Sequence, residues 1–528
     1  MIAQFAGTRR VDARGGGAAK LAHGESPQVI GTGAAKQSFA TLLAVAEPPH
    51  STMGGIIVGM RVVLISTYEM GRQPFGLASP AAWLGRAGAQ VTCCDASRAA
   101  LDEAAVRSAD LIGFYVPMHT ATRLAIALLP RVRELNARAH ICFYGLYAPV
   151  NAAYLRELGV QSILGGEFEE DLARLAEQIG TGAPEGAPGV EAEVSGEEGG
   201  HLGPPLPRLE FITPRRDALP PLREYAHVMM PDGTHRVAGY TEASRGCKHL
   251  CRHCPIVPVY EGAFRIVQPE VALADVRQQV AAGAQHITFG DPDFFNGPGH
   301  AMRIVESLHA EFPGVSYDVT IKIEHLLKHA DLLPRLRDTG CIFVTSAVES
   351  VDDAVLERLD KGHTRADFEH CVAVMRRVGL PLQPTFVPFT PWTTLEGYVD
   401  LLRALADLEL VEHVAPIQLA IRLLIPAGSR LLELEDVRGG VQPFDGAALA
   451  YPWRHRDARV DELQKEIEAL VQTSEKMKRG RARTFERIWN LVHEAPAKSS
   501  PSSVTKTHAM PLLASRATIP YLNEPWYC

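Results

Sequence analysis

The 528-residue sequence lacks two features that would direct a protein into or across a membrane. None of its apolar runs approaches the roughly 18 consecutive residues that a spanning helix requires. The two arginines at positions 9 and 10 are followed by small and acidic residues rather than by the apolar region of a secretory leader. The sequence therefore predicts no leader, no spanning helix and no membrane partner.

An excess of positive charge is also missing. Lys and Arg together number 53 against 61 Asp and Glu, which gives a formal net charge of −8. A protein that binds nucleic acids without regard to sequence usually carries a broad positive field. We therefore do not expect nucleic acid as a partner.

Cysteine is scarce, with nine residues in the whole chain. Small secreted domains that depend on disulfides contain many more cysteines for their length. Most of the nine stand inside apolar runs, which is typical of buried, reduced thiols. The sequence thus predicts a reducing compartment, the cytoplasm, and leaves one cysteine-rich segment to be explained.

That segment, SRGCKHLCRHCPI, gathers Cys247, Cys251 and Cys254 without a fourth cysteine nearby. A structural zinc site is closed by four ligands, commonly in two separated pairs. A cube of four irons held by only three thiolates leaves one iron open to a small molecule with amino and carboxylate groups. Two alternatives remain, namely zinc with His249 or His253 as the fourth ligand, and three cysteines with a structural role. The dense spacing argues against three structural cysteines, whereas spacing alone does not exclude zinc; the position of the segment after the first strand of a second α/β alternation favours an iron–sulfur cluster.

The N-terminal part of the chain changes character at Met60. Residues 1–59 are rich in Gly, Ala and Ser without sustained periodicity, so we expect them to be disordered or to precede a translation start at Met60. Residues 60–180 alternate apolar β-type runs with helical patterns, which indicates a parallel sheet covered on both faces. Five such runs predict a flavodoxin-like doubly wound domain. They lie at residues 61–66, 90–95, 110–117, 140–145 and 162–166.

A linker rich in Pro, Gly and Glu, residues 181–220, leads to a second α/β alternation over residues 221–430. Its six strand–helix units predict a partial (β/α)6 TIM-type barrel, with its chemistry at the C-terminal ends of the strands. The expected strands are 238–244, 286–291, 316–322, 341–349, 382–389 and 416–425. Helical spacing predicts a small helical C-terminal region at 431–495, and a loosely ordered tail at 496–528 follows.

The run from Cys247 to Cys254 resembles the C-x3-C-x2-C signature of the radical SAM superfamily, and the expected barrel follows it. The resemblance covers residues 225–430 and implies a [4Fe-4S] cluster on Cys247, Cys251 and Cys254, with S-adenosylmethionine (SAM) on the open iron. It further implies an enzyme that reductively cleaves SAM to a 5′-deoxyadenosyl radical. An electron donor such as flavodoxin or ferredoxin is an implied partner, while the substrate and the catalytic residues stay unknown.

The same resemblance implies four cofactor-binding residues besides the cysteines. His253 stands where the family usually has an aromatic residue near the adenine, and Asp291 follows the second strand, where the SAM amino group is held. Ser346 and Glu349 lie at the end of the fourth strand, which usually supplies a polar group to the ribose or carboxylate, and Glu349 is the preferred candidate. The alternatives are an ordinary Asp-rich turn for Asp291 and a solvated strand end for Glu349.

A doubly wound domain ahead of such a barrel resembles the cobalamin-binding class of the superfamily. Residues 74–80 resemble the first loop of that class, and residues 165–169 (Gly-Gly-Glu-Phe-Glu) resemble its Gly-Glu motif. The resemblance implies cobalamin as a third cofactor and methyl transfer as one outcome. The first loop has no Asp-x-His-x-x-Gly motif, so no histidine there can replace the lower axial base. The alternative is a domain that has lost cobalamin and only packs on the barrel.

Two other functions stay open. A tRNA-modifying methylthiotransferase would carry a second cluster on three N-terminal cysteines, but the adjacent Cys93 and Cys94 should point to opposite faces of one strand. Cys142 also lies within a strand, so buried apolar roles suit all three cysteines better. The other function is that of a metal-cluster interaction protein without catalysis.

The C-terminal sequence PYLNEPWYC combines aromatic residues with the terminal Cys528. It resembles the start of the tail in a radical SAM group named for Cys-Sec-Ala-Glu-Pro or Cys-Cys-Ala-Glu-Pro. The resemblance implies a tail that docks on the protein, and it raises the hypothesis that a recoded selenocysteine follows Cys528. A TGA codon followed by Ala-Glu-Pro codons would support that hypothesis, and any other stop would refute it.

Overall fold

The computed structural model describes residues 57, 59–182, 209–494 and 519–523, all of them within one compact unit, residues 54–528. Several predictions lie mainly outside these described residues: the N-terminal extension, the centre of the linker, the first part of the tail, and Cys528. In the described ranges, no helix has the combined length and apolarity needed to cross a membrane.

The packed structure extends slightly beyond the predicted domain limits. Ile57 is buried, and its amide donates to the carbonyl of Ala87 at 3.0 Å, so ordered packing begins before Met60. Phe211 and Leu219 are also buried, each in a hydrophobic core of one of the two domains. The last part of the expected linker therefore belongs to the folded structure.

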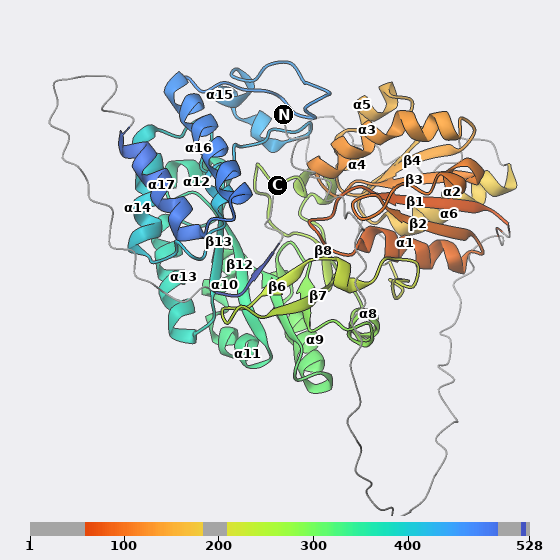
Figure 1. Ribbon diagram of the computed structural model, residues 1–528, viewed down its shortest axis with the longest axis horizontal. Helices are drawn as coiled ribbons and strands as arrows, with labels where there is room; N and C mark the ends of the chain where they lie inside the picture. The colour runs from red at the N-terminus through yellow and green to blue at the C-terminus, as the bar shows by residue number, and fades with distance from the viewer. Residues whose placement is uncertain (1–56, 58, 183–208, 495–518, 524–528) are drawn as a thin grey trace, which may run out of the picture. The chain divides into compact units, whose positions relative to one another are not determined.

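The first domain is a five-stranded parallel sheet in the order β2-β1-β3-β4-β5 (Figure 1). Its strands are β1 (Arg61–Ser66), β2 (Gln90–Asp95), β3 (Leu111–Tyr115), β4 (His140–Tyr144) and β5 (Ser162–Leu164). This is the flavodoxin-like order, so the predicted fold of the domain is confirmed. Because the order reverses between β1 and β3, a ligand crevice is expected at the C-terminal ends of these strands.

Helices cover both faces of this sheet (Figure 1). One face carries α1 (Phe75–Arg86) and α6 (Phe168–Thr181), and the other carries α2 (Glu103–Ser108), α3 (His119–Leu135) and α5 (Ala152–Glu157). Val62 and Leu64 of β1 point into the first core, whereas Val63 and Ile65 point into the second. This alternation explains why the strand is apolar at successive positions.

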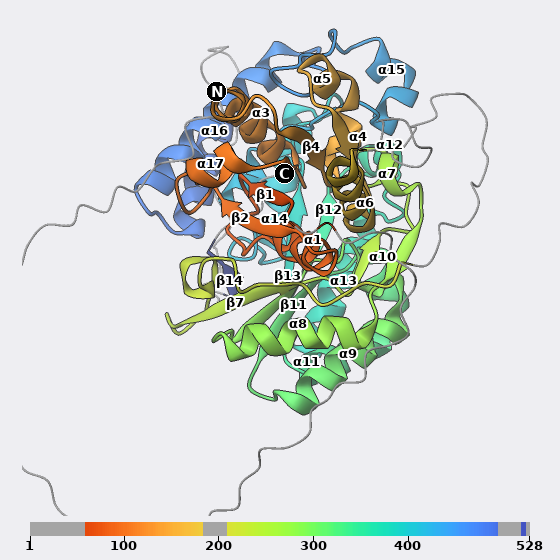
Figure 2. The same cartoon turned by 90° about the vertical axis from the view of Figure 1, so that its right-hand side faces the viewer.

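The second domain is built on a sheet in the order β13-β12-β11-β10-β7-β6-β14 (Figure 2). Its parallel strands are β7 (His235–Thr241), β10 (His286–Phe289), β11 (Ser316–Thr320), β12 (Cys341–Glu349) and β13 (Leu382–Phe386). The helices that alternate with them include α8 (Pro269–Ala281), α9 (Pro298–Glu311), α11 (Leu333–Asp338), α13 (Arg365–Val378) and α14 (Leu395–Asp407). The prediction of a partial TIM-type barrel is confirmed over its first five strand–helix units.

The prediction of a sixth strand at residues 416–425 is wrong for most of that segment. Pro416–Leu419 forms a 3-10 helix, η5, and in the part of the chain that the structure describes this segment pairs only through an isolated parallel bridge between Arg422 and Phe389. A proline cannot donate to a strand ladder. The Gln418 side chain instead accepts from the Phe386 amide at 3.1 Å, so a side chain satisfies the edge of β13.

The C-terminal region is helical, as predicted, with α16 (Ala458–Lys476) and α17 (Arg481–Glu494) packed on the barrel core. The described part of the tail forms β14 (Tyr521–Leu522), which pairs antiparallel with β6 (His227–Met229). The Gln383 side chain donates to the carbonyl of Pro520 at 2.6 Å. The end of the chain that the structure describes therefore docks on the barrel sheet.

Candidate active site

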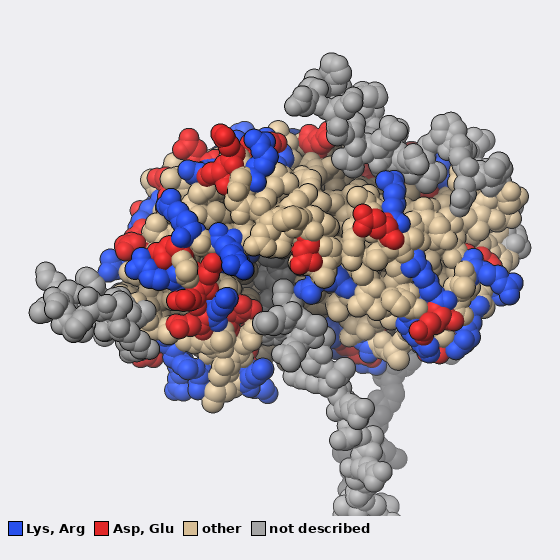
Figure 3. Space-filling view, turned by 90° about the horizontal axis from the view of Figure 1, so that it is seen from above, with Lys and Arg blue, Asp and Glu red and all other residues tan. Residues whose placement is uncertain are grey.

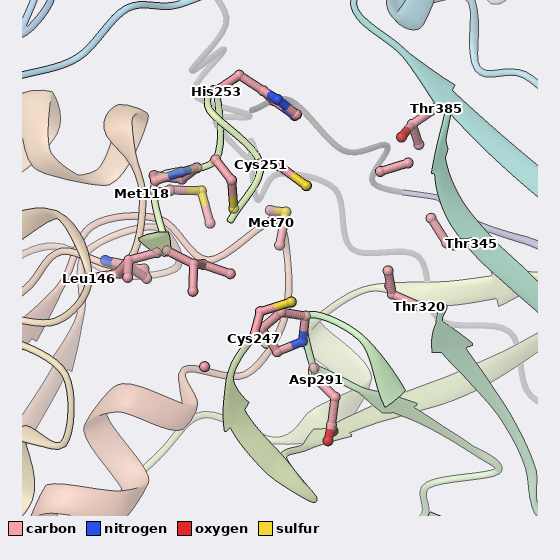
Figure 4. Close-up of a pocket in the computed structure, with 18 of the residues that line it drawn as sticks. Met70, Met118, Leu146, Cys247, Cys251, His253, Asp291, Thr320, Thr345 and Thr385 are labelled. Carbon is pink, nitrogen blue, oxygen red and sulfur yellow. The ribbon is translucent and has the colours of Figure 1, made fainter. Parts of the chain in front are cut away.

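A cavity of about 410 Å³ lies where the strands of both domains end. From the barrel, Thr320 and Thr385 line it near the C-terminal ends of β11 and β13, and Thr345 lines it from the middle of β12 (Figure 4). From the first domain, the lining includes Met70 after β1 and Leu146 after β4. Parallel α/β folds place their active sites at these strand ends, so both domains contribute to one site.

All three cysteines of the motif line this cavity, on a segment called here the cysteine loop, residues 247–254. Figure 4 labels two of them, Cys247 and Cys251. The loop follows β8 (Ser244–Gly246), which pairs with β9 (Phe264–Ile266). Gly246 has φ of 71°, and a Cβ there would lie 2.3 Å from the carbonyl oxygen of Ala263. Only glycine fits this turn, and the turn directs the cysteines into the cavity.

The three sulfurs of the cysteine loop are not gathered as tightly as the ligands of one zinc ion. Three thiolates bound to one zinc ion at about 2.3 Å would lie roughly 4 Å apart. Among the described residues only His249, Asp293 and His325 bring three metal-ligating atoms within 4.8 Å of one another, so the three sulfurs are spread more widely. Burial raises the pKa of the Cys254 thiol to about 12 and also raises that of Cys247. A metal group that keeps these thiols ionised suits the donor set.

His253, predicted to lie near the adenine, faces Glu349. Its Nε2 atom lies 3.1 Å from Glu349 Oε1, and Lys361 Nζ donates to the same oxygen at 3.3 Å. Burial alone would raise the pKa of Glu349, but Lys361 and His253 outweigh it and lower this pKa to about 2. Glu349 is therefore ionised, and it connects the cysteine loop to the end of β12.

The backbone of Glu349 is strained. Its φ of 70° lies in the left-handed region, and the pairing of β12 with β13 shifts register between Ala347 and Glu349. The residue is only 6% exposed, which argues against a solvated strand end. Strain of this kind concentrates at functional sites, and it supports the prediction that Glu349 helps to bind a cofactor.

Asp291 lines the cavity after β10, but its carboxylate already has partners. It accepts from the amide of Ala243 at 2.9 Å and from the hydroxyl of Ser244. Burial raises the pKa of Asp291 to about 7 in spite of these two hydrogen bonds. Asp291 thus fixes the segment that leads into the cysteine loop, and its contact with the SAM amino group stays a prediction.

The structure places Ser346 away from the cavity. Successive side chains of a strand point to opposite faces, so Thr345 and Ala347 line the cavity and Ser346 does not. Ser346 is fully buried, and its hydroxyl has no hydrogen-bond partner among the described residues. At this level of β12 the cavity is therefore lined by Thr345 rather than by Ser346, in line with the two-residue spacing that relates residues 345, 347 and 349.

The Gly-Gly-Glu-Phe-Glu segment, residues 165–169, contacts the barrel through its two glutamates. Glu169 accepts hydrogen bonds from Arg245 at 2.6 and 2.8 Å, and Glu167 pairs with Arg265 at 2.9 Å. Arg245 lies on β8 and Arg265 on β9. The motif therefore docks the first domain on the two strands that flank the cysteine loop.

The first domain presents an apolar surface to the cavity. Met70, Met118 and Leu146 line it from the loops after β1, β3 and β4 (Figure 4). At the end of β1, Ser66 Oγ and Glu69 Oε2 are buried, and the described residues offer them no hydrogen-bond partner. Apolar contacts for a flat ring, with unsatisfied polar atoms at the switch point of the sheet, fit the ring of a corrinoid lying on these loops.

The space beneath the same loops is filled by aromatic rings. The Tyr144 ring lies 5.5 Å from that of Tyr115 and 4.9 Å from that of Phe168, measured between centroids. A Cβ at Gly76 would lie 2.2 Å from the Tyr115 ring, so α1 rests directly on that ring. Residues 74–80, expected as a loop, in fact begin α1. A corrinoid would thus lie over the loops rather than reach between the sheet and α1.

The other cysteines of the first domain do not form a second metal site. Cys93 packs against the core under α1 and α6, whereas Cys94 belongs to the core on the opposite face, as predicted. Cys142 is fully buried in β4. Burial raises the pKa of Cys93 to about 12 and raises that of Cys142 as well. These three cysteines therefore behave as buried apolar residues.

Two residues of the site were not singled out from the sequence. Lys361 contacts Glu349, and Arg245 contacts Glu169. Arg245 is charged and lies two residues before the cysteine loop, which is only a weak indication in the sequence that it belongs to the site. Nothing local in the sequence indicates the partner of Lys361.

Residues 241–402 match a family model described as the radical SAM superfamily. Among curated proteins, ribosomal protein uS12 methylthiotransferase RimO of Parabacteroides distasonis is 28% identical over 189 residues, which are 33% of this chain and 42% of that protein. The tRNA-2-methylthio-N(6)-dimethylallyladenosine synthase of Desulfosudis oleivorans is 25% identical over 290 residues, 52% of this chain and 56% of that one. Bacteriochlorophyllide d C-8(2)-methyltransferase of Chlorobaculum tepidum is 24% identical over 191 residues, covering 33% and 39%. The chain thus spans between 39% and 56% of the length of these relatives.

Two solved structures resemble the whole two-domain arrangement. The cobalamin-dependent SAM radical enzyme OxsB, with aqua-cobalamin bound, aligns with a TM-score of 0.61 at 16% identity, over 79% of this chain and 67% of that one. The radical SAM methyltransferase TsrM from Kitasatospora setae, with tryptophan and a SAM analogue bound, gives 0.55 at 17% identity over 72% and 78%. These likenesses confirm the fold class.

Proposed function

We propose that this chain, which carries a radical SAM superfamily domain in the fold of the cobalamin-dependent radical SAM enzymes, is an enzyme that reductively cleaves SAM. The cleavage supplies a 5′-deoxyadenosyl radical that abstracts a hydrogen atom from a substrate in the cavity. One observation carries this proposal. Cys247, Cys251 and Cys254 share one loop, and all three line a cavity at the strand ends.

The side chains around the loop suit this role. The three thiolates would hold a [4Fe-4S] cluster, which supplies an electron to SAM when bound. Glu349, kept ionised by Lys361 and His253, can accept hydrogen bonds from the hydroxyl or ammonium groups of SAM. Phe289 and Phe386 line the same cavity and exclude water from it. The protein thus positions and shields the reactants.

We further propose cobalamin as the third cofactor. When bound, it supplies a methyl group for transfer to a carbon atom of the substrate. Met70, Met118 and Leu146 would contact the ring, and residues 67–74, between β1 and α1, contain no histidine that could replace the lower axial base. The apolar surface of the loops and the fold shared with a cobalamin-containing structure support this assignment.

A methylthiotransferase is the second candidate, because one curated relative is named a methylthiotransferase and another is named for the synthesis of a methylthio-adenosine in tRNA. Such an enzyme would use a second cluster in its N-terminal part. Cys93 and Cys94 lie on opposite faces of β2, which argues against a second cluster in this domain. Iron analysis separates the two candidates, since one cluster gives about four irons per chain and two clusters give about eight.

We expect a small-molecule or peptide substrate rather than a polyanion, and the charge on one face of the molecule agrees with this expectation. On the face shown in Figure 3, Lys and Arg alternate with Asp and Glu, without a broad positive area.

An electron donor must reach the cluster, and a flavodoxin or ferredoxin would suit this need.

Anaerobic reconstitution tests the proposed function. The full-length chain, loaded with iron and sulfide and reduced with dithionite, should convert SAM to 5′-deoxyadenosine. A chain that binds the cluster but leaves SAM intact would be an interaction protein instead. Zinc in place of iron after anaerobic preparation would refute the cluster assignment.

A further inference from the structure

A second group of metal-ligating side chains lies beside the cysteine loop. His249, Asp293 and His325 each place one ligand atom within 4.8 Å of the other two. His249 belongs to the cysteine loop, Asp293 immediately precedes η3 (Phe294–Asn296) after β10, and His325 lies in α10 (Ile323–Lys328) after β11. The group therefore joins the loop to the ends of two barrel strands.

The facing atoms of this group are buried, and the Asp293 carboxylate lies within ion-pair distance of both histidines. The Asp293 side chain is 0% exposed, and those of His325 and His249 are 10% and 18% exposed. His249 Nε2, Asp293 Oδ2 and His325 Nδ1 have no hydrogen-bond partner within the described residues. Two imidazole nitrogens and one buried carboxylate oxygen thus face one another without good hydrogen-bond geometry, which is the arrangement that a shared metal ion would satisfy.

The distances suit a metal ion better than a chain of hydrogen bonds. Asp293 Oδ2 lies 2.7 Å from His325 Nδ1 and 3.6 Å from His249 Nε2, and the closer contact lacks hydrogen-bond geometry. Ligands held at about 2.0–2.2 Å from a tetrahedral ion lie roughly 3.3 Å apart. Movements below 1 Å would bring the two measured distances to that value.

A neighbouring backbone amide orients one of the ligands. Asp293 Oδ1 accepts from the amide of Phe295 at 3.2 Å, which leaves Oδ2 directed to the histidines. The other ring nitrogen of His249 lies 3.8 Å from a carboxylate oxygen of Glu324. This contact is longer than a hydrogen bond, so Glu324 adds a negative charge beside the site and does not fix the His249 ring.

We infer that His249, Asp293 and His325 bind a divalent first-row transition metal, with zinc as the best match to two imidazoles and one carboxylate. The ion would fasten the cysteine loop to the ends of β10 and β11. This site is distinct from the one formed by the three cysteines. Its ligands are nitrogen and oxygen, and its occupancy does not depend on SAM cleavage.

Zinc binding to the full-length, cluster-loaded protein tests this inference. The protein is equilibrated with zinc chloride without oxygen and passed over a weak chelating resin, after which zinc and iron are measured in one sample. We expect one zinc per chain, and X-ray absorption at the zinc edge should show only nitrogen and oxygen neighbours, at about 2.0–2.2 Å. Asp293→Asn and His325→Gln should each lower the zinc content at least tenfold.

The controls separate this site from the cysteines and from surface binding. His329→Gln removes a histidine whose ring lies 6.0 Å from that of His325, and it should leave the zinc content unchanged. A fifth iron with a high-spin ferrous Mössbauer signal, lost in Asp293→Asn, would support the site with iron as its metal. Sulfur in the zinc shell, no retained metal besides the cluster iron, or equal zinc in all variants would overturn the inference.

Discussion

Arg245 and Glu169 form a bidentate ion pair between the barrel and the doubly wound domain. Arg245 donates to the two carboxylate oxygens at 2.6 and 2.8 Å, and the side chains are only 8% and 0% exposed. Arg245 lies two residues before the first cysteine of the loop. The first domain therefore helps to hold the cysteine loop in place, in addition to any cofactor that it binds.

Loss of this ion pair should destabilise the protein strongly. In Glu169→Gln the guanidinium of Arg245 stays buried without its full counter-charge, and breaking such a pair costs about 3–5 kcal/mol. Urea unfolding of the full-length chain measures this loss. Glu170→Gln is the matched control, because Glu170 pairs with Arg174 at the surface and its loss should cost less than about 1 kcal/mol. Equal effects of the two variants would contradict the role given to Glu169.

The cysteine loop should account for all of the cluster iron. Cys254→Ala removes one of three protein ligands, so anaerobically reconstituted protein should fall from about four irons per chain to less than one. Cys93→Ser, in the first domain, should keep the full iron content. A loss of half of the iron in Cys93→Ser, from a starting value near eight, would instead favour a methylthiotransferase.

The contact of Glu349 with His253 and Lys361 should govern how firmly the loop holds its cluster. Glu349→Gln removes the negative charge that both neighbours face, so we expect iron to be lost to a chelator about 10–100 times faster. The measurement is the rate of iron release under anaerobic conditions. Glu357→Gln, at an exposed position of α12 (Asp353–Leu359), should leave that rate unchanged. Identical rates in the two variants would show that Glu349 does not support the loop.

Asp291 should make the stability of the protein depend on pH. Its pKa is about 7 in the fold against 3.8 for the free group, so its stabilising contribution is fully present below about pH 4 and is lost as the pH rises through 7. Asp291→Asn removes this titration. Between pH 5.5 and pH 8, the unfolding free energy of the variant should therefore gain about 2 kcal/mol relative to that of the unaltered protein.

Urea unfolding at the two pH values measures this difference. Asp331→Asn, at an exposed position, should show no such change between the two pH values. A constant difference between Asp291→Asn and the unaltered protein would mean that Asp291 is ionised throughout this range.

A charge on the cavity face of the first domain should prevent binding of a corrinoid. Leu146→Asp places a carboxylate where an apolar ring face is expected, and burying that charge without a partner is strongly unfavourable. Cobalt per chain, after reconstitution with hydroxocobalamin and gel filtration, should fall at least tenfold. Ala153→Asp lies at an exposed position of α5 and should retain cobalt. An absence of cobalt from the unaltered protein would show that the domain only packs on the barrel.

Local periodicity explains what could be predicted about the fold. The doubly wound domain and five of the barrel strands are visible in the sequence because a strand buried on both faces is apolar at consecutive positions. The prediction of a sixth strand was wrong. Residues 416–425 are apolar enough for a strand, but Pro416 and the hydrogen bond between Gln418 and the Phe386 amide favour a 3-10 turn. Apolar content alone does not distinguish these two structures.

The sequence by itself identified the cysteine loop, because the C-x3-C-x2-C spacing places three thiols within eight residues. Only the tertiary structure decided which distant side chains meet that loop. Glu349 lies 96 residues from His253, and Glu169 lies 76 residues from Arg245, so no local pattern could pair them. The same holds for His249, Asp293 and His325, which come together because parallel strands end at one edge of a sheet.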